Sequence, residues 1–110
     1  MIAFHYDYTA FSLHGRNRFP ALYGWDMNWE RFRPRAPDGH IFVNSGMQLE
    51  WITGGYLKSF YHEVYFGEDT ELAKQKALKE GRSLWRVAST CFSRVEGNKI
   101  MKPFEPFCTE

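Results

Sequence analysis

Residues 46–64 read GMQLEWITGGYLKSFYHEV, and this segment combines a short helix, a turn and a strand. The Gly54-Gly55 pair ends the helix predicted over residues 47–52, because glycine tolerates the positive φ angles of tight turns. Residues 56–66 then alternate as a strand that places His62 among apolar neighbours on one face. Taken alone, this pattern favours a buried core histidine over a metal ligand.

Two further candidate ligands lie at the start of the chain. Residues 2–8, IAFHYDY, are predicted to form a strand. His5 and Asp7 share one face of this strand, because side chains alternate between the two faces. An imidazole and a carboxylate at this spacing can converge on one point, although an isolated His-x-Asp is usually a chance pair.

The last predicted strand, residues 82–94, places Arg86 on the same face as Leu84 and Phe92. A guanidinium on an inward face needs an anion, because burying an unpaired charge is costly. The anion can be an Asp or Glu side chain, or a ligand carboxylate bound through two parallel hydrogen bonds. The sequence leaves both possibilities open.

The remaining pattern predicts an all-β protein with one short inserted helix. That helix covers residues 69–80, DTELAKQKALKE, with Asp69 as a candidate N-cap and Gly81 as the stop. Short strands and glycine turns make up most of the rest of the chain. The 110 residues fit one domain, residues 1–110, built as a β-barrel or as two packed sheets.

Charge and hydropathy argue against two classes of partner. The formal net charge of +1 gives no basis for nucleic-acid binding, which requires clustered cations. Arg31, Arg33 and Arg35 are close in sequence, but prolines interrupt the segment, and a solvated loop is the preferred interpretation. No apolar run reaches the roughly 18 residues of a membrane span, so no membrane partner is expected.

The two cysteines, Cys91 and Cys108, cannot build a disulfide framework and have no metal-binding spacing. The first residues do not resemble a signal peptide, since they lack a basic segment and a long apolar run. These observations predict a cytoplasmic protein with reduced thiols.

His5, Asp7 and His62 together form a set of two histidines and one carboxylate. Such a set can hold Fe(II) on one face and leave positions open for a bidentate co-substrate and dioxygen. Zinc also binds such a set, with water as the fourth ligand. The residues by themselves therefore leave an iron site and a zinc site as alternatives.

The ordered motifs resemble the isopenicillin-N-synthase-like branch of the 2-oxoglutarate/Fe(II)-dependent oxygenases. The resemblance covers nearly the whole chain, through FHYDYTAF with its HxD, DGHIFVNSG, QLEWITGGYLKSFYHEV and RVASTCF. It implies a jelly-roll (double-stranded β-helix) core in which His5, Asp7 and His62 hold Fe(II) and Arg86 binds a carboxylate of 2-oxoglutarate. The implied reaction oxidises a small organic molecule and converts 2-oxoglutarate to succinate and CO2.

Two positions depart from the family pattern, and a third residue offers an alternative to Arg86. Ala88 stands where the family has the serine of Arg-x-Ser, so one hydroxyl toward the co-substrate is lost. Arg82 offers a rival to Arg86, but its place at a junction of helix and strand favours Arg86. Glu63 replaces the arginine that usually follows the distal histidine.

Members of the family carry helices and barrel strands before HxD, whereas His5 lies near the start of this chain. The jelly roll is therefore expected to be incomplete on its N-terminal side, with exposed edges that favour self-association or pairing with a missing N-terminal region. By position only, Phe11, Leu13 and Phe92 are expected to line the substrate pocket. The alternative function is a non-catalytic fragment or pseudo-enzyme that acts as an interaction module.

Overall fold

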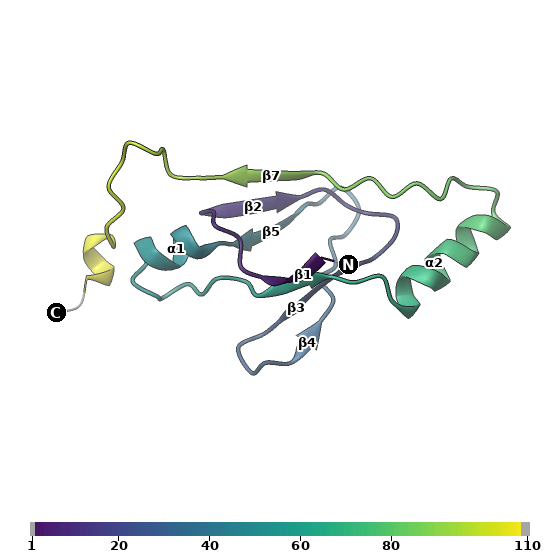
Figure 1. The fold of residues 1–110 in the computed structure, drawn as a ribbon, viewed down its shortest axis with the longest axis horizontal. Helices are drawn as coiled ribbons and strands as arrows, with labels where there is room; N and C mark the ends of the chain where they lie inside the picture. Colours follow the sequence, from purple (N-terminus) through teal and green to yellow (C-terminus); the bar gives the residue numbers. More distant parts are fainter. Residues whose placement is uncertain (1, 109–110) are drawn as a thin grey trace.

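A computed structural model describes residues 2–108 of the chain. Within these residues, short strands form two antiparallel sheets, and helices lie toward the two ends of the molecule (Figure 1). The strands are β1 (Ile2–His5), β2 (Phe11–His14), β3 (Leu22–Trp25), β4 (Arg31–Phe32), β5 (Phe42–Ser45), β6 (His62–Val64) and β7 (Thr90–Ser93).

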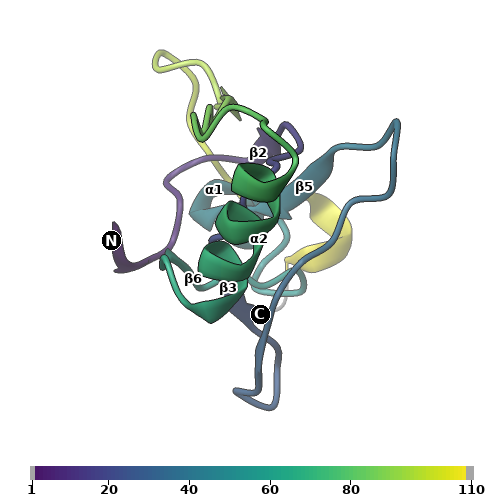
Figure 2. The same ribbon diagram turned by 90° about the vertical axis from the view of Figure 1, so that its right-hand side faces the viewer.

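The chain passes repeatedly from one sheet to the other. One sheet has the strand order β1-β6-β3-β4, and the other has the order β5-β2-β7. The successive pairs β1 and β2, β5 and β6, and β6 and β7 are each divided between the sheets. Figure 2 shows the molecule from the side of the longer helix, which lies in front of the strands. This all-β arrangement of two antiparallel sheets confirms the predicted jelly-roll class.

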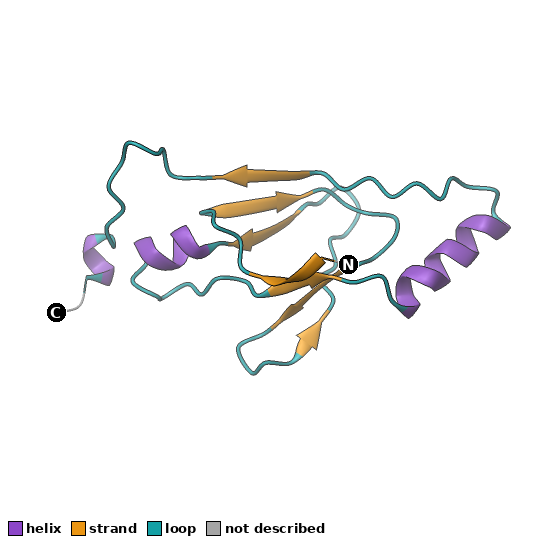
Figure 3. Cartoon of the chain, in the orientation of Figure 1, coloured by secondary structure: helices purple, strands orange, loops and turns teal. Residues whose placement is uncertain are grey.

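Two α-helices extend the sheets, in purple in Figure 3. α1 (Met47–Ile52) is the predicted short helix, and Gly54 and Gly55 follow it with φ angles of 57° and 81°. α2 (Glu68–Lys79) begins one residue earlier than predicted, with Gly67 rather than Asp69 at its N-cap. Gly81, with a φ of 63°, ends this helix as expected.

A single 3-10 turn, η1 (Glu105–Phe107), lies near the end of the described chain. Across residues 2–108, no helix combines the length and the apolar content that crossing a bilayer requires.

Two predicted strands are much shorter in the structure than the alternation of their residues indicated. Only β6 within residues 56–66, and only β7 within residues 82–94, pairs in a sheet. Before β6, single bonds hold the backbone and no continuous pairing forms: the Ser59 amide donates to Glu50 Oε2 at 2.7 Å, and the Phe60 amide donates to the Ser45 carbonyl oxygen at 3.0 Å. Alternation indicates which side chains share a face, but a strand also needs a hydrogen-bonded neighbour. Most of the run from α2 to β7 has none (Figure 1).

The buried part of the described chain is mainly polar. Eight polar or charged residues are buried, against four apolar ones, while large apolar side chains such as Trp85 and Ile100 are exposed. Burying polar groups is costly unless they are hydrogen-bonded. Throughout residues 2–108, every buried side-chain nitrogen and oxygen has a hydrogen-bond partner. Four of the buried polar residues, Asp7, Thr9, Ser12 and Asn44, form one hydrogen-bonded network that belongs to the candidate site.

Candidate metal centre

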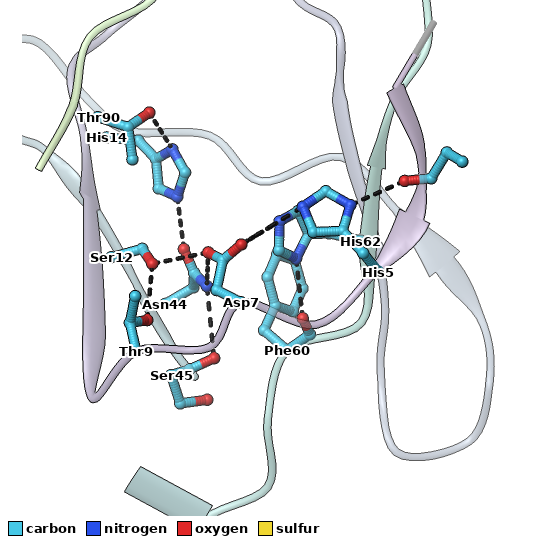
Figure 4. Close-up of polar contacts among 11 residues, drawn as sticks. His5, Asp7, Thr9, Ser12, His14, Asn44, Ser45, Phe60, His62 and Thr90 are labelled. Carbon is cyan, nitrogen blue, oxygen red and sulfur yellow. Dashed lines mark hydrogen bonds and ion pairs between the residues drawn. The ribbon is translucent and has the colours of Figure 1, made fainter. Parts of the chain in front are cut away.

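Strand pairing brings the two candidate histidine ligands together. β1 and β6 are antiparallel neighbours, and His5 is the direct partner of His62 in their register. The two imidazole centroids are 4.4 Å apart. Asp7 lies just beyond β1, which ends at His5 and not at residue 8 as predicted. The chain turns there toward β2, and this turn points the carboxylate back at the histidines (Figure 4).

The three side chains converge on one point. Asp7 Oδ1 lies 3.4 Å from His5 Nε2 and 3.4 Å from His62 Nε2. One ligand atom from each residue lies within 4.8 Å of the others. Ligand atoms that bind one ion at about 2.1 Å are roughly 3 to 3.5 Å apart, so this spacing suits a shared metal ion. His62 and Asp7 are buried, and His5 is half-buried at the mouth of the site.

The two histidines are oriented by the same local device. His5 Nδ1 lies 2.8 Å from the carbonyl oxygen of Ala3, and His62 Nδ1 lies 2.8 Å from that of Phe60. A carbonyl oxygen can only accept, so each Nδ1 carries the proton and donates it. Each Nε2 then presents its lone pair toward Asp7, which is the tautomer that a metal ligand needs.

Hydrogen bonds from the sheet β5-β2-β7 fix the orientation of the Asp7 carboxylate. Ser12 Oγ on β2 donates to Asp7 Oδ2 at 2.6 Å, and Asn44 Nδ2 on β5 donates to the same oxygen at 3.3 Å. Asn44 Oδ1 in turn accepts a bond from His14 Nε2 at 2.5 Å. These bonds engage Oδ2 and leave Oδ1 directed at the histidines (Figure 4).

Sequence reasoning missed Ser12, His14 and Asn44. Alternation along residues 11–14 places Ser12 and His14 on one face, which was an available signal. The pairing of Ser12 with Asn44 across β2 and β5 was not readable from spacing, because it depends on the sheet order.

Electrostatics favour the metal-binding protonation states of two candidate ligands, Asp7 and His62. Burial raises the pKa of Asp7, but the hydrogen bonds from Ser12 and Asn44 and the neighbouring His62 and His5 outweigh it, so this pKa lies below its ordinary value. Burial lowers the pKa of His62, which keeps its imidazole neutral. A carboxylate and a neutral imidazole are the forms that bind metal ions.

A cavity of about 500 Å³ opens beside the three candidate ligands, and Arg86 lines it. Arg86 Nε donates to the Phe19 carbonyl oxygen at 3.1 Å, and its guanidinium lies 5.6 Å from the centre of the Phe66 ring. Burial lowers the pKa of Arg86. In the part of the chain that the structure describes, no carboxylate forms an ion pair with it. Its outer nitrogens therefore remain available to an anion in the cavity.

The rival arginine is engaged elsewhere. Arg82 Nε pairs with Glu80 Oε2 at 2.6 Å on the surface, and Arg82 does not line the cavity. Glu63, which departs from the family pattern, pairs with Arg31 through a 2.7 Å contact between Oε1 and Nη2. The glutamate at this position is thus matched by a cation on β4, which lies two strands away from β6 in the same sheet.

Only one of the three residues predicted to line the substrate pocket lines this cavity. Phe92 lines the cavity, together with Ala88 and the ligands. Phe92 is paired with Ser12 across β7 and β2, so it shares the face of Ser12. Phe11 and Leu13 alternate to the opposite face of β2 and are not among the residues that line this cavity.

No protein-family model and no curated protein matches the sequence. Among solved structures, the chain is similar to a full-length Neurospora crassa protein in complex with alpha-KG, with a TM-score of 0.76 and 14% identity over 99% of this chain and 31% of that one. It is also similar to AtDAO1, dioxygenase for auxin oxidation 1 from Arabidopsis thaliana, bound to 2-oxoglutarate. There the TM-score is 0.77 and the identity 15%, over 98% of this chain and 36% of that one.

A third similar structure, from Caulobacter crescentus, is assigned to the 2OG-Fe(II) oxygenase family. Its TM-score is 0.75 and its identity 18%, over 98% of this chain and 32% of that one. The chain spans about a third of the length of the structures it matches. At these identities the likeness is one of fold: the chain has the fold of the corresponding part of the 2-oxoglutarate/Fe(II) oxygenases.

Proposed function

We propose that this chain is the C-terminal catalytic-core portion of a 2-oxoglutarate/Fe(II)-dependent dioxygenase of the isopenicillin-N-synthase-like branch. One observation carries the proposal. His5, Asp7 and His62 direct two imidazole nitrogens and one carboxylate oxygen to a single point, at a cavity that Arg86 also lines. Two histidines and a carboxylate on one side of an ion are the ligand set of non-haem Fe(II) oxygenases.

The residues present fit the implied ion and co-substrate. The ligand atoms are nitrogen and oxygen, and the two cysteines are exposed and outside the cluster. Arg86 offers a guanidinium without a carboxylate partner among residues 2–108, and guanidinium binds a carboxylate through two parallel hydrogen bonds. Arg86 would bind one carboxylate of 2-oxoglutarate, while the oxo-acid end of that molecule would lie at the three ligands.

The proposed reaction takes up one dioxygen and one 2-oxoglutarate for each molecule of substrate oxidised. One oxygen atom enters succinate as CO2 leaves, and the other enters the substrate as a hydroxyl group. Bound Fe(II) would supply the oxygen chemistry. The chain's own residues hold the ion, fix the tautomers of both histidines and restrict water through the burial of His62 and Asp7.

The substrate is proposed to be a small organic molecule. The similar Neurospora crassa protein has been crystallised with thymine and with 5-formyluracil, both of which are small molecules. Phe92, at the cavity, is the strongest of the three proposed substrate contacts. Phe11 and Leu13 would contact substrate only through surfaces outside this cavity.

The remaining parts of the proposal concern the whole protein. A single domain over residues 1–110 is proposed, with no nucleic-acid or membrane partner. Exposed apolar side chains on several strands, such as Ile2 and Phe11, support self-association or pairing with a further region. Both cysteines are free, as is usual where thiols stay reduced, and this supports a cytoplasmic location.

Anaerobic titration with Fe(II) in the presence of 2-oxoglutarate tests the proposal. The wild type is expected to develop the weak visible charge-transfer band of an iron–oxo-acid chelate, and His62→Ala is expected to lose it. His40→Ala is the matched control, because His40 Nδ1 also bonds a carbonyl two residues before it, at 3.0 Å, but His40 is not in the cluster. A folded wild type without the band, or an undiminished band in His62→Ala, would contradict the proposal. Metal analysis of the purified protein separates iron from zinc.

A further inference from the structure

The wall of the cavity carries an excess of positive charge. Arg16, Arg33, Arg35 and Arg86 all line it, and Asp7 is the one acidic residue among its lining residues within 2–108. The sequence favoured a solvated loop for residues 31–35. In the structure Arg31 lies on β4, Arg33 and Arg35 follow it in the loop, and Arg31 and Arg35 are exposed as expected. The contacts of the three arginines nevertheless differ.

Two of these arginines are paired with aspartates that do not line the cavity. Arg33 Nη1 lies 3.0 Å from Asp69 Oδ2, and Arg16 pairs with Asp38. Arg35 and Arg86 form no ion pair with any carboxylate of residues 2–108. Two unmatched guanidinium groups therefore border one cavity.

The charge balance of the cavity distinguishes the roles of Arg35 and Arg86. In the proposed function, 2-oxoglutarate brings two carboxylates, and a divalent ion, Asp7 and Arg86 together present the charge that neutralises them. Arg35, on the exposed wall of the cavity, takes no part in this balance, so its positive charge is free to bind a further anion. Because the cavity of about 500 Å³ falls within the range of small-molecule sites, it has room for a second small molecule beside the co-substrate.

The backbone around Arg35 is stiff. Pro34 precedes it and Pro37 follows Ala36, and proline fixes φ and restricts the residue before it. Pro34 and Ala36 also line the cavity. A long side chain on such a segment loses less freedom on binding than one on a flexible loop.

We propose that this cavity takes an anionic substrate, a small organic molecule that carries a carboxylate or phosphate group, and that Arg35 binds this group. The inference rests on the proposed function for its second ligand, 2-oxoglutarate, and extends it by naming the substrate class. Arg35 is a specificity-determining residue in this scheme, since it selects acids over neutral analogues without touching the reacting atoms.

The test uses the full chain loaded with Mn(II), in place of Fe(II), and with 2-oxoglutarate. Probes are a panel of small carboxylic acids, each beside its primary amide, and of phosphate monoesters, each beside its parent alcohol. Affinities are measured by ligand-observed NMR and by calorimetry. In the wild type, at least one class of anion is expected to bind about tenfold more tightly than its neutral partner. The two arms distinguish carboxylate from phosphate.

Arg35→Gln is expected to remove most of this preference and to leave the affinity for 2-oxoglutarate unchanged. Arg94→Gln, which changes an exposed arginine outside the cavity lining, should alter neither. Equal binding of all anions and their neutral partners by the wild type, or a full preference in Arg35→Gln, would overturn the inference.

The outcomes also separate the inference from the function beneath it. If 2-oxoglutarate does not bind but an Arg35-dependent preference for anions persists, the proposed function fails and the anion site stands. If 2-oxoglutarate binds through Arg86 and no preference for anions exists, the function stands and the inference fails.

Discussion

The two sheets contribute different things to the candidate centre. The sheet β1-β6-β3-β4 supplies both histidines, each locked by a carbonyl of its own chain segment. The sheet β5-β2-β7 supplies no ligand but holds the carboxylate of Asp7 through Ser12 and Asn44. Asp7 lies in the link between the sheets. The candidate site therefore lies between the two sheets, and the contribution of each sheet can be tested by separate substitutions.

The largest effect is expected at Asp7, which lies between the two sheets. Asp7→Ala removes the one carboxylate that reaches both histidines, and metal affinity should fall by more than about 100-fold, beyond the loss typical of an outer partner. Anaerobic Fe(II) titration measures this loss. Asp38→Ala, at an exposed aspartate paired with Arg16, is the control and should bind iron normally. Stoichiometric iron retained in Asp7→Ala would remove the site from its proposed place.

The second prediction distinguishes binding of the co-substrate from binding of the metal ion. Arg86→Gln should weaken 2-oxoglutarate binding about 10- to 100-fold, because a charge-assisted pair contributes about 1.5 to 3 kcal/mol. Metal affinity should change little, since Arg86 bonds Phe19 and not a ligand. Calorimetry with Mn(II) present gives both affinities.

Arg82→Gln is the paired variant for this test. Arg82 is engaged with Glu80 on the surface, so its loss should leave both affinities unchanged. The reverse result, with Arg82→Gln weak and Arg86→Gln normal, would assign the co-substrate to the other arginine.

The third effect comes from the sheet β5-β2-β7, which holds the Asp7 carboxylate. Ser12→Ala removes the 2.6 Å bond to Asp7 Oδ2, so the pKa of Asp7 should rise and metal affinity should fall about tenfold. As the pH is lowered, metal should leave this variant at a higher pH than it leaves the wild type. Ser93→Ala, at an exposed serine on β7, is the control. Identical pH profiles for Ser12→Ala and the wild type would mean that the second sheet does not tune the carboxylate.

The same division explains what could be predicted from the sequence. The short helix α1 and the approximate extent of α2 followed from local signals, a glycine pair and a helix-rich composition. The candidate ligands were predicted only from the resemblance of the ordered motifs to a family, because the local patterns alone favoured a chance His-x-Asp and a core histidine. The register that pairs His5 with His62, and the bonds from Ser12 and Asn44, depend on which strands become neighbours. Alternation carries no information on neighbours, so the strands predicted over residues 56–66 and 82–94 were too long.

Arg35 illustrates the same limit on the surface. Three arginines at alternate positions looked equivalent in sequence, but Arg31 pairs with Glu63, Arg33 with Asp69, and Arg35 with no carboxylate of residues 2–108. These differences arise from partners 32 and 36 residues away, which no local pattern specifies.

The smallest expected effect concerns stability without metal. Burial holds the pKa of His62 below its ordinary value of 6.5, so the unfolded chain binds this proton more readily than the folded chain. Unfolding free energy should therefore decrease as the pH falls below about 6.5, with a slope of at most about 1.4 kcal/mol per pH unit, until the folded-state pKa is passed. Asp7, whose pKa is also lowered, adds a loss of stability only below its ordinary value of 3.8.

Urea unfolding of the metal-free protein between pH 5 and 8 measures this slope. His62→Gln should flatten it, because the buried group that resists protonation is gone. His40→Gln should keep the wild-type slope, since His40 is exposed. An unchanged slope in His62→Gln would show that burial in the first sheet does not control protonation of the ligand. The protonation of the candidate ligands would then be controlled only by the sheet β5-β2-β7, through its hydrogen bonds to Asp7.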